Sequence, residues 1–356
     1  MYPVSSEILV LLNQSYKVLG RLRASVNGSP FTYPVKMQDA SVSVSGSSPI
    51  RRTLTATIQA QIDDAECDVF RTEMRAEYGL EDIAGNQYWV PVGTFVITDA
   101  EEASPGVMSI KGEDRWRRVV NARFLQPTVT SGSHITAIKT LVTGSDGRIT
   151  CDDYTLSTAT HTQSLWDRDR DKAIIQLATA LGAQVSFNPM GVAEIRYAAS
   201  LGDPLAWIVA GGDGGVLINA KRGKNQSITY NAAVAEGENS DGTAPIRAIV
   251  KVIDPSSPLL YGGSFASRPR YFKSSLITSN PQALQTATSM LARVTGVART
   301  GSLDTLPHPG LDSGDLLRIE VQPGVWEDHL VDSFTLPLGP GSVSITSRTN
   351  PDAAGE

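Results

Sequence analysis

The most restrictive feature of the sequence is a strict two-residue alternation that runs from Thr53 to Ile62. Apolar residues occupy every even position of this stretch, and uncharged polar residues lie between them. Successive side chains of a β-strand point to opposite faces of a sheet, so this period predicts a strand with one buried face and one hydrated face. The apolar positions are Leu54, Ala56, Ile58, Ala60 and Ile62, and the polar ones are Thr53, Thr55, Thr57, Gln59 and Gln61.

Shorter alternating stretches recur along the chain, for example at residues 22–26 and 41–45, and turn residues separate them. The 356 residues include 31 glycines and 20 prolines spread from end to end. Such punctuation favours many short strands, and the length exceeds what one ordinary core contains. We therefore predict a mainly β protein of two to four domains.

Besides a short helix at the N-terminus and one over residues 280–296, two segments in the middle of the chain carry helical signals and interrupt the strands. Ser133 and Ser164 are predicted N-caps of helices over residues 133–144 and 164–182, because a serine hydroxyl can accept an otherwise unpaired backbone N–H. Gly182 suits the position just after a helix, where the backbone is left-handed. These segments predict a small α/β insert within the β-rich chain.

Two distant segments of the sequence resemble each other, and we call this similarity the internal echo. Residues 96–110 (VITDAEEASPGVMSI) and 331–345 (VDSFTLPLGPGSVSI) both lead through a Pro-Gly turn into a strand that carries Pro-Gly-x-x-Ser-Ile. Chance agreement over so short a stretch is one explanation, and duplication of a β-domain is the other. Under duplication, the predicted domains are a first β-domain at 1–124, an α/β insert at 125–205, and a second β-domain at 206–254 and 301–356 that a helical insert at 255–300 interrupts.

Composition and spacing argue against catalysis. The net charge of −6 gives no global basic surface for nucleic acid, and it suits a surface past which DNA can slide. Cys67 and Cys151 match no metal spacing and are expected to be free thiols. The four histidines are far apart, and adjacent carboxylates on a strand point to opposite faces, so they cannot converge as a glycosidase requires. We predict no catalytic residue, no metal and no cofactor.

Two basic groups are candidate contact sites. Arg115, Trp116 and Arg117 form the denser group, and Arg51 with Arg52 forms the other. One interpretation is contact with nucleic acid through charge and stacking. The alternative is a contact between subunits or domains, where arginine pairs with carboxylates.

Several of these motifs resemble a family of minor tail proteins of phages that infect actinobacteria. The shared features are the opening segment VSSEILVLLNQSYKVLGRLRAS, a double arginine before a Thr-rich strand at residues 51–55 (RRTLT), and a Pro-x-Gly-x-Phe strand at 91–95 (PVGTF). Near the C-terminus, Pro309, Gly314 and Asp315 resemble the turn that precedes the closing barrel strand of phage tail hubs. The resemblance covers both ends of the chain and leaves its middle loosely matched.

The resemblance implies a structural hub of the tail tip with duplicated, tube-like β-barrel or sandwich domains. Such a hub is a homotrimer whose six similar domains dock on a six-fold tail tube. It implies assembly in the host cytoplasm into the virion, with a distal tail protein, a tape measure protein and tip or fibre proteins as partners. We expect no membrane segment, because the apolar run Ile8–Leu12 is too short for one.

A ring of this kind leaves a central channel for DNA exit. The polar face of the Thr53–Gln61 strand suits such a channel because hydroxyl and amide groups are hydrated without fixed charge, and Thr55 and Thr57 are the candidate lining residues. Two other functions remain as alternatives: a hexameric distal tail or tail tube protein, and a secreted carbohydrate-binding or polysaccharide-degrading β-protein. The last requires an aromatic platform or a carboxylate cleft, whereas aromatic residues make up only 6% of the chain.

Overall fold

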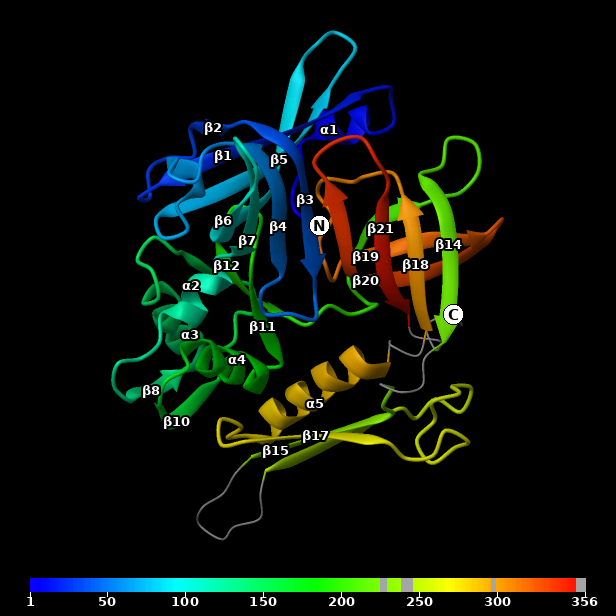
Figure 1. Cartoon of the computed structure of the whole chain (residues 1–356). Helices are drawn as coiled ribbons and strands as arrows, with labels where there is room; N and C mark the ends of the chain where they lie inside the picture. The colour runs from blue at the N-terminus through cyan, green and yellow to red at the C-terminus, as the bar shows by residue number, and fades with distance from the viewer. Residues whose placement is uncertain (225–228, 238–245, 296–298, 350–356) are drawn as a thin grey trace.

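The computed structural model describes residues 1–356 except 225–228, 238–245, 296–298 and 350–356. The described part is mainly β, as predicted from the sequence, and a sheet of 13 strands dominates it. Figure 1 shows this sheet in the upper part of the molecule, with helices and smaller sheets below it. The large sheet contains two groups of strands, which we call the first and second β-units.

The first β-unit is formed by the N-terminal third of the chain. Helix α1 (Ser6–Leu11) precedes its strands, and a short 3-10 helix, η1 (Ala65–Cys67), lies between the fourth and fifth of them. Neighbouring strands are antiparallel in the order β3-β4-β7-β6-β5-β1-β2. The strands are β1 (Lys17–Val26), β2 (Tyr33–Val35), β3 (Met37–Ser45), β4 (Arg52–Gln59), β5 (Thr72–Glu81), β6 (Gln87–Ser104) and β7 (Val107–Asp114).

The second β-unit is formed by segments from the last 152 residues of the chain. Its strands follow the order β14-β18-β21-β20-β19-β13. All neighbours are antiparallel except β13 and β19, which are parallel. The strands are β13 (Leu205–Val209), β14 (Leu217–Lys224), β18 (Arg299–Thr305), β19 (Leu316–Gln322), β20 (Val325–Pro337) and β21 (Val343–Thr349).

Apart from β2, which has no counterpart among the described strands of the second unit, the two β-units have the same strand order. In chain order, β1, β3, β4, β5, β6 and β7 of the first correspond to β13, β14, β18, β19, β20 and β21 of the second. Register irregularities coincide as well: the β6–β7 pair shifts between Ile97 and Asp99, and the β20–β21 pair shifts between Val331 and Ser333. The echo noted in the sequence therefore lies in corresponding hairpins, although its first strand moves by one residue, so that Ile97 rather than Val96 matches Val331.

One strand joins the two β-units. The first half of β20 pairs with β19, and its second half, Ser333–Pro337, pairs with β3 of the first β-unit. Phe334 and Leu336 lie opposite Val44 and Val42, and all four side chains are buried. The apolar faces of both β-units consequently form one continuous hydrophobic core.

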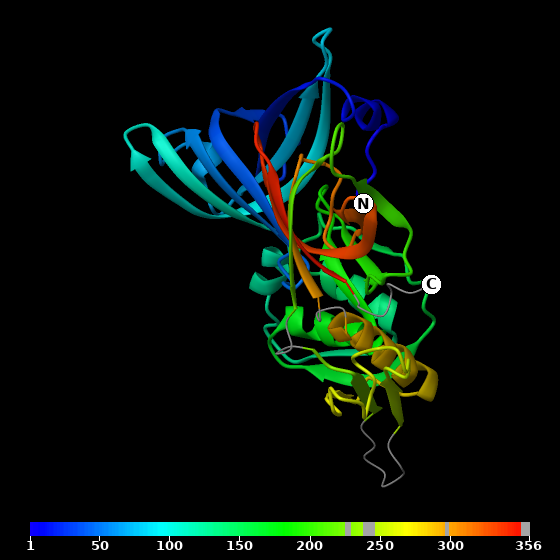
Figure 2. The same cartoon turned by 90° about the vertical axis from the view of Figure 1, so that its right-hand side faces the viewer.

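The remaining elements pack together as an insert layer with its own core. Figures 1 and 2 both show α5 and its neighbouring strands at the end of the molecule away from the large sheet's upper hairpins. The predicted inserts share this core, because Ala180 and Thr286 are in contact through a 3.1 Å hydrogen bond. The layer contains α2 (Trp116–Asn121), β8 (Thr128–Ser133), α3 (His134–Thr143), β9 (Cys151–Asp153), β10 (Thr160–Trp166), α4 (Arg170–Ala180), β11 (Ala183–Phe187), β12 (Ala193–Tyr197), β15 (Ala232–Gly237), β16 (Arg247–Lys251), β17 (Pro269–Ser274) and α5 (Asn280–Thr295). No helix of the described residues is long and apolar enough to cross a lipid bilayer.

The helix predictions in this layer are partly confirmed. The hydroxyl of Ser133 accepts the backbone N–H of Thr136 and caps α3, and Gly182 follows α4 with a φ of 67°. The predicted N-cap Ser164 is wrong, because that residue lies in β10 and pairs with Thr130 of β8. Asp169 occupies the N-cap of α4 instead. Pairing with a distant strand overrides the local helical signal here.

Candidate functional site

The polar side of β4 opens onto a broad hydroxyl-bearing surface. Thr53, Thr55 and Gln59 are exposed and Thr57 is half-buried, whereas Leu54, Ala56 and Ile58 are buried, so the predicted alternation is confirmed within β4. It does not reach Ile62, which lies beyond the strand and is 52% exposed. Serine and threonine side chains of five neighbouring strands extend this surface, and we call the set the hydroxyl face. It comprises Ser302 of β18, Ser344 and Thr346 of β21, Ser333 and Thr335 of β20, Ser41, Ser43 and Ser45 of β3, Thr53, Thr55 and Thr57 of β4, and Ser109 of β7.

The hydroxyl face crosses the joint between the two β-units. Thr335, Ser43 and Thr53 lie side by side on β20, β3 and β4. The hydroxyl oxygens of Ser43 and Thr335 are 2.9 Å apart, within hydrogen-bonding distance. The face is therefore a property of the joined β-units and belongs to neither alone.

Fixed charge next to β4 on the hydroxyl face is ion-paired, and Lys221 of β14, opposite Ser302, is an exposed cation at the edge of the face. Lys111 lies opposite Thr55, and its ammonium nitrogen is 3.2 Å from a carboxylate oxygen of Asp99. Glu113 lies opposite Thr53 and accepts a 2.5 Å hydrogen bond from Arg117. A passing polyanion would meet hydrated hydroxyl groups and ion-paired cations rather than a cluster of free positive charge.

Arg51 and Arg52 hold three parts of the chain together from inside. Their backbone N–H groups donate to one oxygen of Asp114 over 2.8 and 2.9 Å. The guanidinium of Arg52 is buried, donates to the Phe187 carbonyl of the insert layer, and lies 2.6 Å from Asp312 of the second β-unit. Burial raises the pKa of Asp114 to about 6.

The carboxylate of Asp312 faces opposing influences. Burial alone would raise its pKa, yet Arg52 and Arg51 hold that pKa below the ordinary value. The Arg52 side chain is 2% exposed and the Asp312 side chain is 20% exposed, so the ion pair is largely desolvated and removing either partner leaves a mostly buried charge uncompensated.

The second basic group is also turned inward. Trp116 is 1% exposed and meets Phe187 edge-on, with ring centroids 6.3 Å apart. The Arg115 guanidinium lies 2.8 Å from Glu73, a buried carboxylate. Burial would raise the pKa of Glu73, but Arg115 and Arg118 lower it below the ordinary value.

The predicted contact residues fall into a buried group and a surface group. Arg52 and Trp116 are buried within the chain, where they contact other parts of the same chain, as the interdomain alternative describes. The subunit-interface or channel role of the predicted contact residues stays a prediction. Arg51 and Arg115 lie largely within the chain as well. Thr55 and Thr57 lie on the hydroxyl face, and Arg117 keeps about a third of its side chain exposed, at 31%.

Sequence reasoning missed most of the hydroxyl face. The alternating serines at 41–45 carried a usable signal, since they repeat the period of the Thr53–Gln59 stretch. Ser302 and Thr346 carried none of their own, because only the pairing of β18 with β21 brings them together.

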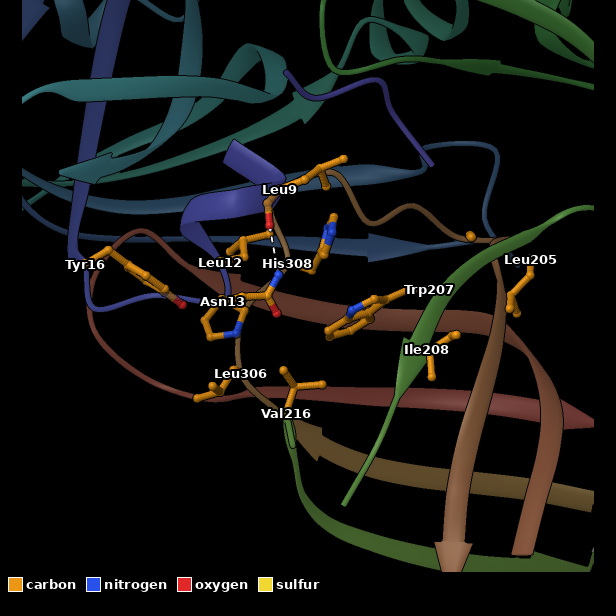
Figure 3. A pocket seen from close by; sticks show the side chains of 12 residues that line it. Leu9, Leu12, Asn13, Tyr16, Leu205, Trp207, Ile208, Val216, Leu306 and His308 are labelled. Carbon is orange, nitrogen blue, oxygen red and sulfur yellow. Dashed lines mark hydrogen bonds between the residues drawn. The ribbon is translucent and has the colours of Figure 1, made fainter. Parts of the chain in front are cut away.

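An apolar cavity of 460 Å³ opens beside the second β-unit. Figure 3 shows side chains of α1 and β13 around it, including Leu9, Leu12, Trp207 and Ile208, with His308 next to the indole. The Trp207 and His308 rings are 5.0 Å apart, and burial lowers the pKa of His308 to about 4. The imidazole is therefore neutral near pH 7, and none of the described residues that line the cavity is a carboxylate to pair with it in acid–base chemistry.

A polar cleft of 650 Å³ lies where the N-terminus meets β12 and the loop before β19. Its carboxylates are engaged within the chain: Glu194 lies 2.8 Å from Arg196, Asp315 contacts the N-terminal amino group, and Asp203 accepts hydrogen bonds from the backbone N–H and hydroxyl of Ser200. Asp312, which also lines it, pairs with Arg52. These charges hold the chain together and do not form a free carboxylate pair facing a substrate.

The thiols and potential metal ligands show no reactive arrangement. Cys67 and Cys151 are free thiols, as predicted, and burial raises their pKa values to about 11 and about 12. Both are protonated near pH 7 and are weak nucleophiles. Within the described ranges, no three His, Cys, Asp or Glu side chains are grouped to hold a metal ion.

Comparison with known proteins identifies the fold. The sequence matches no protein-family model, and no curated protein is significantly similar to it. Among solved structures, the tail protein from Neisseria meningitidis MC58 superposes with a TM-score of 0.64 at 12% identity, covering 94% of this chain and 97% of that one. The 43 kDa tail protein of prophage MuSo2 from Shewanella oneidensis gives 0.63 at 15% identity, covering 95% and 100%. The prophage tail protein gp18 from Listeria monocytogenes EGD-e gives 0.58 at 11%, covering 93% and 94%. This chain therefore has the fold of phage tail proteins over nearly its whole length.

Proposed function

We propose that this chain is a non-enzymatic structural protein of a phage tail, and that it forms a homotrimeric hub at the tail tip. The observation that carries this proposal is the repeated strand order of the two β-units, together with the coincident register shifts. Three copies with two equivalent β-units each would present six similar domains, which lets a three-fold tip dock on a six-fold tube. The fold shared with phage tail proteins supports the same assignment.

In this proposal the hydroxyl face lines the central channel through which DNA leaves the virion. The face is continuous across both β-units, so it would repeat around the ring without interruption. Its hydroxyl groups can be hydrated, and Lys111 on it is ion-paired with Asp99, so DNA would meet no cluster of free positive charge and would pass without being held.

The proposed partners follow from a position between tube and tip. Besides two further copies of itself, the hub would contact a distal tail protein, the tape measure protein and tip or fibre proteins of the same virion. The helical and small-sheet surface of the insert layer lies away from the large sheet and is the natural side for such contacts (Figure 1). Assembly in the host cytoplasm would precede its location at the virion tail tip.

The deciding experiment is native mass spectrometry of the purified protein combined with cryo-electron microscopy of the tail tip. We expect a trimer in solution and a ring with three chains and six β-units in the particle. Six copies per particle would favour the hexameric distal tail or tail tube alternative. A chain that stays monomeric within assembled virions would contradict both ring proposals.

A further inference from the structure

Two edges of the large sheet carry opposite charges. Each corresponds to one of the two strands that pair where the β-units join within the chain. The first, which we call the acidic edge, is residues 98–104 of β6; the second, the basic edge, is β14. We propose that the acidic edge of one copy pairs with the basic edge of a second copy of this chain in a defined antiparallel register. This inference rests on the proposed ring and specifies how its subunits meet.

The strand β20 provides the internal template for this joint. It pairs with β19 up to Leu330, and beyond the register shift its second half pairs with β3. Its counterpart β6 pairs with β5 up to Val96 and, within the described part of the chain, its second half pairs only with β7. The acidic edge thus has the unpaired backbone groups that β20 uses to hold β3.

The basic edge is the counterpart of β3. The β3–β4 pair shifts register between Met37 and Asp39, and the β14–β18 pair shifts between Leu217 and Asn219. This common irregularity aligns Val42 of β3 with Arg222 of β14. Among the described residues, β14 pairs with β18 on one side and ends the sheet on the other (Figure 1), whereas β3 has β20 at that side.

Transferring the observed register predicts the contacts between copies. Leu336 lies opposite Val42 within the chain. In the alignment of β20 with β6, Leu330 corresponds to Val96, so Leu336 corresponds to Glu102. In the alignment of β3 with β14, Val42 corresponds to Arg222. The joint between copies therefore places Glu102 of one copy opposite Arg222 of the next.

Charge distinguishes the two kinds of joint. The acidic edge carries Asp99, Glu101 and Glu102, all exposed, and the basic edge carries Lys221 and Arg222, both exposed. Within the chain Arg222 lies 2.8 Å from Glu327 and Asp99 lies 3.2 Å from Lys111, so at the joint Arg222 would be shared between Glu327 of its own copy and Glu102 of the next. Where the internal joint buries an apolar pair, the joint between copies brings together opposite charges. A charged edge also keeps a separate subunit soluble, because it discourages unspecific strand pairing.

The same charges select a head-to-tail arrangement. Two acidic edges repel each other, and so do two basic edges, which disfavours the two-fold dimers that free sheet edges readily form. Only the acidic-to-basic pairing is attractive, and it leaves one edge of each kind free until a ring closes. The two edges therefore encode the direction of assembly.

The first test reverses the charges, using Glu102→Arg, Arg222→Glu and the double variant. Sedimentation across a concentration series should show each single variant assembling with a Kd at least roughly tenfold weaker than that of the unchanged chain, while the double variant recovers assembly. Asp167→Arg, at a 77% exposed side chain of the insert layer, is the matched control and should assemble normally. Unchanged assembly of both single variants, or no recovery in the double variant, would overturn the register.

The second test does not depend on charge. Glu102→Cys combined with Arg222→Cys should form a disulfide between copies under mild oxidation, because opposed Cα atoms of an antiparallel pair lie about 4.5–5.5 Å apart. Asp99→Cys combined with Arg222→Cys lies about 10 Å out of register and should not cross-link. Covalent dimers and trimers from the first pair alone are the expected result, and equal cross-linking of both pairs would contradict it.

The outcomes separate this inference from the proposed function. A trimer that forms without any effect of the charge reversals and without the specific cross-link would leave the hub standing and reject the joint. A chain that does not form a ring at all would reject both. A tail-tip map in which the acidic edge pairs with a different protein would also reject the joint.

Discussion

The first and second β-units share a strand order but differ in the connections between strands and in their outermost strand. In the first, β3 and β4 are joined by a short hairpin connection, whereas in the second the chain between β14 and β18 leaves the sheet to build part of the insert layer with α5. The outermost strand also differs, because β1 runs antiparallel to β5 and β13 runs parallel to β19. The four inner strands of each unit pair in the same order despite these two differences. The strand pairing of the sheet, rather than the connections between its strands, is therefore what the two β-units share.

The two β-units also differ at their ends. The second half of β20 carries Phe334 and Leu336 and is buried against β3, whereas the second half of β6 is acidic and exposed. Equivalent backbone positions thus serve a permanent apolar joint in one unit and a free charged edge in the other. The difference lies in side chains alone, so substitutions can test it directly.

The largest effect is expected from cutting the buried tie between the two β-units. Arg52→Ala leaves the largely buried Asp312 without its ion-pair partner, which should lower the free energy of unfolding by about 3 kcal/mol. Urea denaturation followed by circular dichroism measures this loss. Arg117→Ala removes a partly exposed ion pair and should lower the free energy of unfolding by only about 0–1 kcal/mol. Equal losses for the two variants would contradict the role given to Arg52.

A comparable loss is expected at the internal joint. Leu336→Ala opens a cavity in the common core and should lower the free energy of unfolding by about 2–5 kcal/mol. The matched variant is Glu102→Ala at the equivalent exposed position, which should change it by less than about 0.5 kcal/mol at a protein concentration where copies do not associate. If both variants behaved alike, the contrast between the joint and the free edge would be wrong.

Mild acid should distinguish the β-units as well. Residues 1–114 contain no histidine, whereas burial lowers the pKa of His308 in the second unit and of His134 in the insert layer to about 4. The unfolded chain binds these protons near pH 6.5 and the folded chain only near pH 4, so stability present above pH 6.5 is lost as the pH falls between those values.

Acidification should lower the free energy of unfolding by up to roughly 3 kcal/mol for each of the two buried histidines, His308 and His134. Hydrogen exchange at pH 7 and pH 5 should show protection decreasing in β18–β21 and α3 before it decreases in β1–β7. His308→Gln should remove part of the pH dependence of unfolding while the first β-unit keeps its protection. A uniform loss over both units would show that these histidines do not govern the response.

The smallest effect on stability is expected at the hydroxyl face. Thr55→Lys in β4 and Ser302→Lys in β18 lie at corresponding exposed positions and should each change the free energy of unfolding by less than about 0.5 kcal/mol. If the face lines the channel, Thr55→Lys together with Thr57→Lys should slow DNA release from particles that still assemble. Release kinetics measured by dye fluorescence test this, and normal kinetics would reject the placement.

The sequence by itself determined the features that depend on neighbours along the chain. The period-two pattern of Thr53 to Gln59 set which side chains are buried, and Ser133 set the start of α3, because faces and caps follow from local geometry. The repeated Pro-Gly-x-x-Ser-Ile motif likewise marked two corresponding hairpins.

Only the tertiary structure decided the features that depend on distant pairing. The segment around Ser164 is a strand because it pairs with β8, and β20 pairs with β3 to join the β-units. Arg52 and Trp116 are buried by parts of the chain far from them in sequence. Each of these outcomes comes from hydrogen bonds, ion pairs or packing between residues far apart in the chain, and no local periodicity encodes such a partner. The burial of a charged or aromatic side chain is decided by what packs against it, which the residue's own neighbours in sequence do not specify.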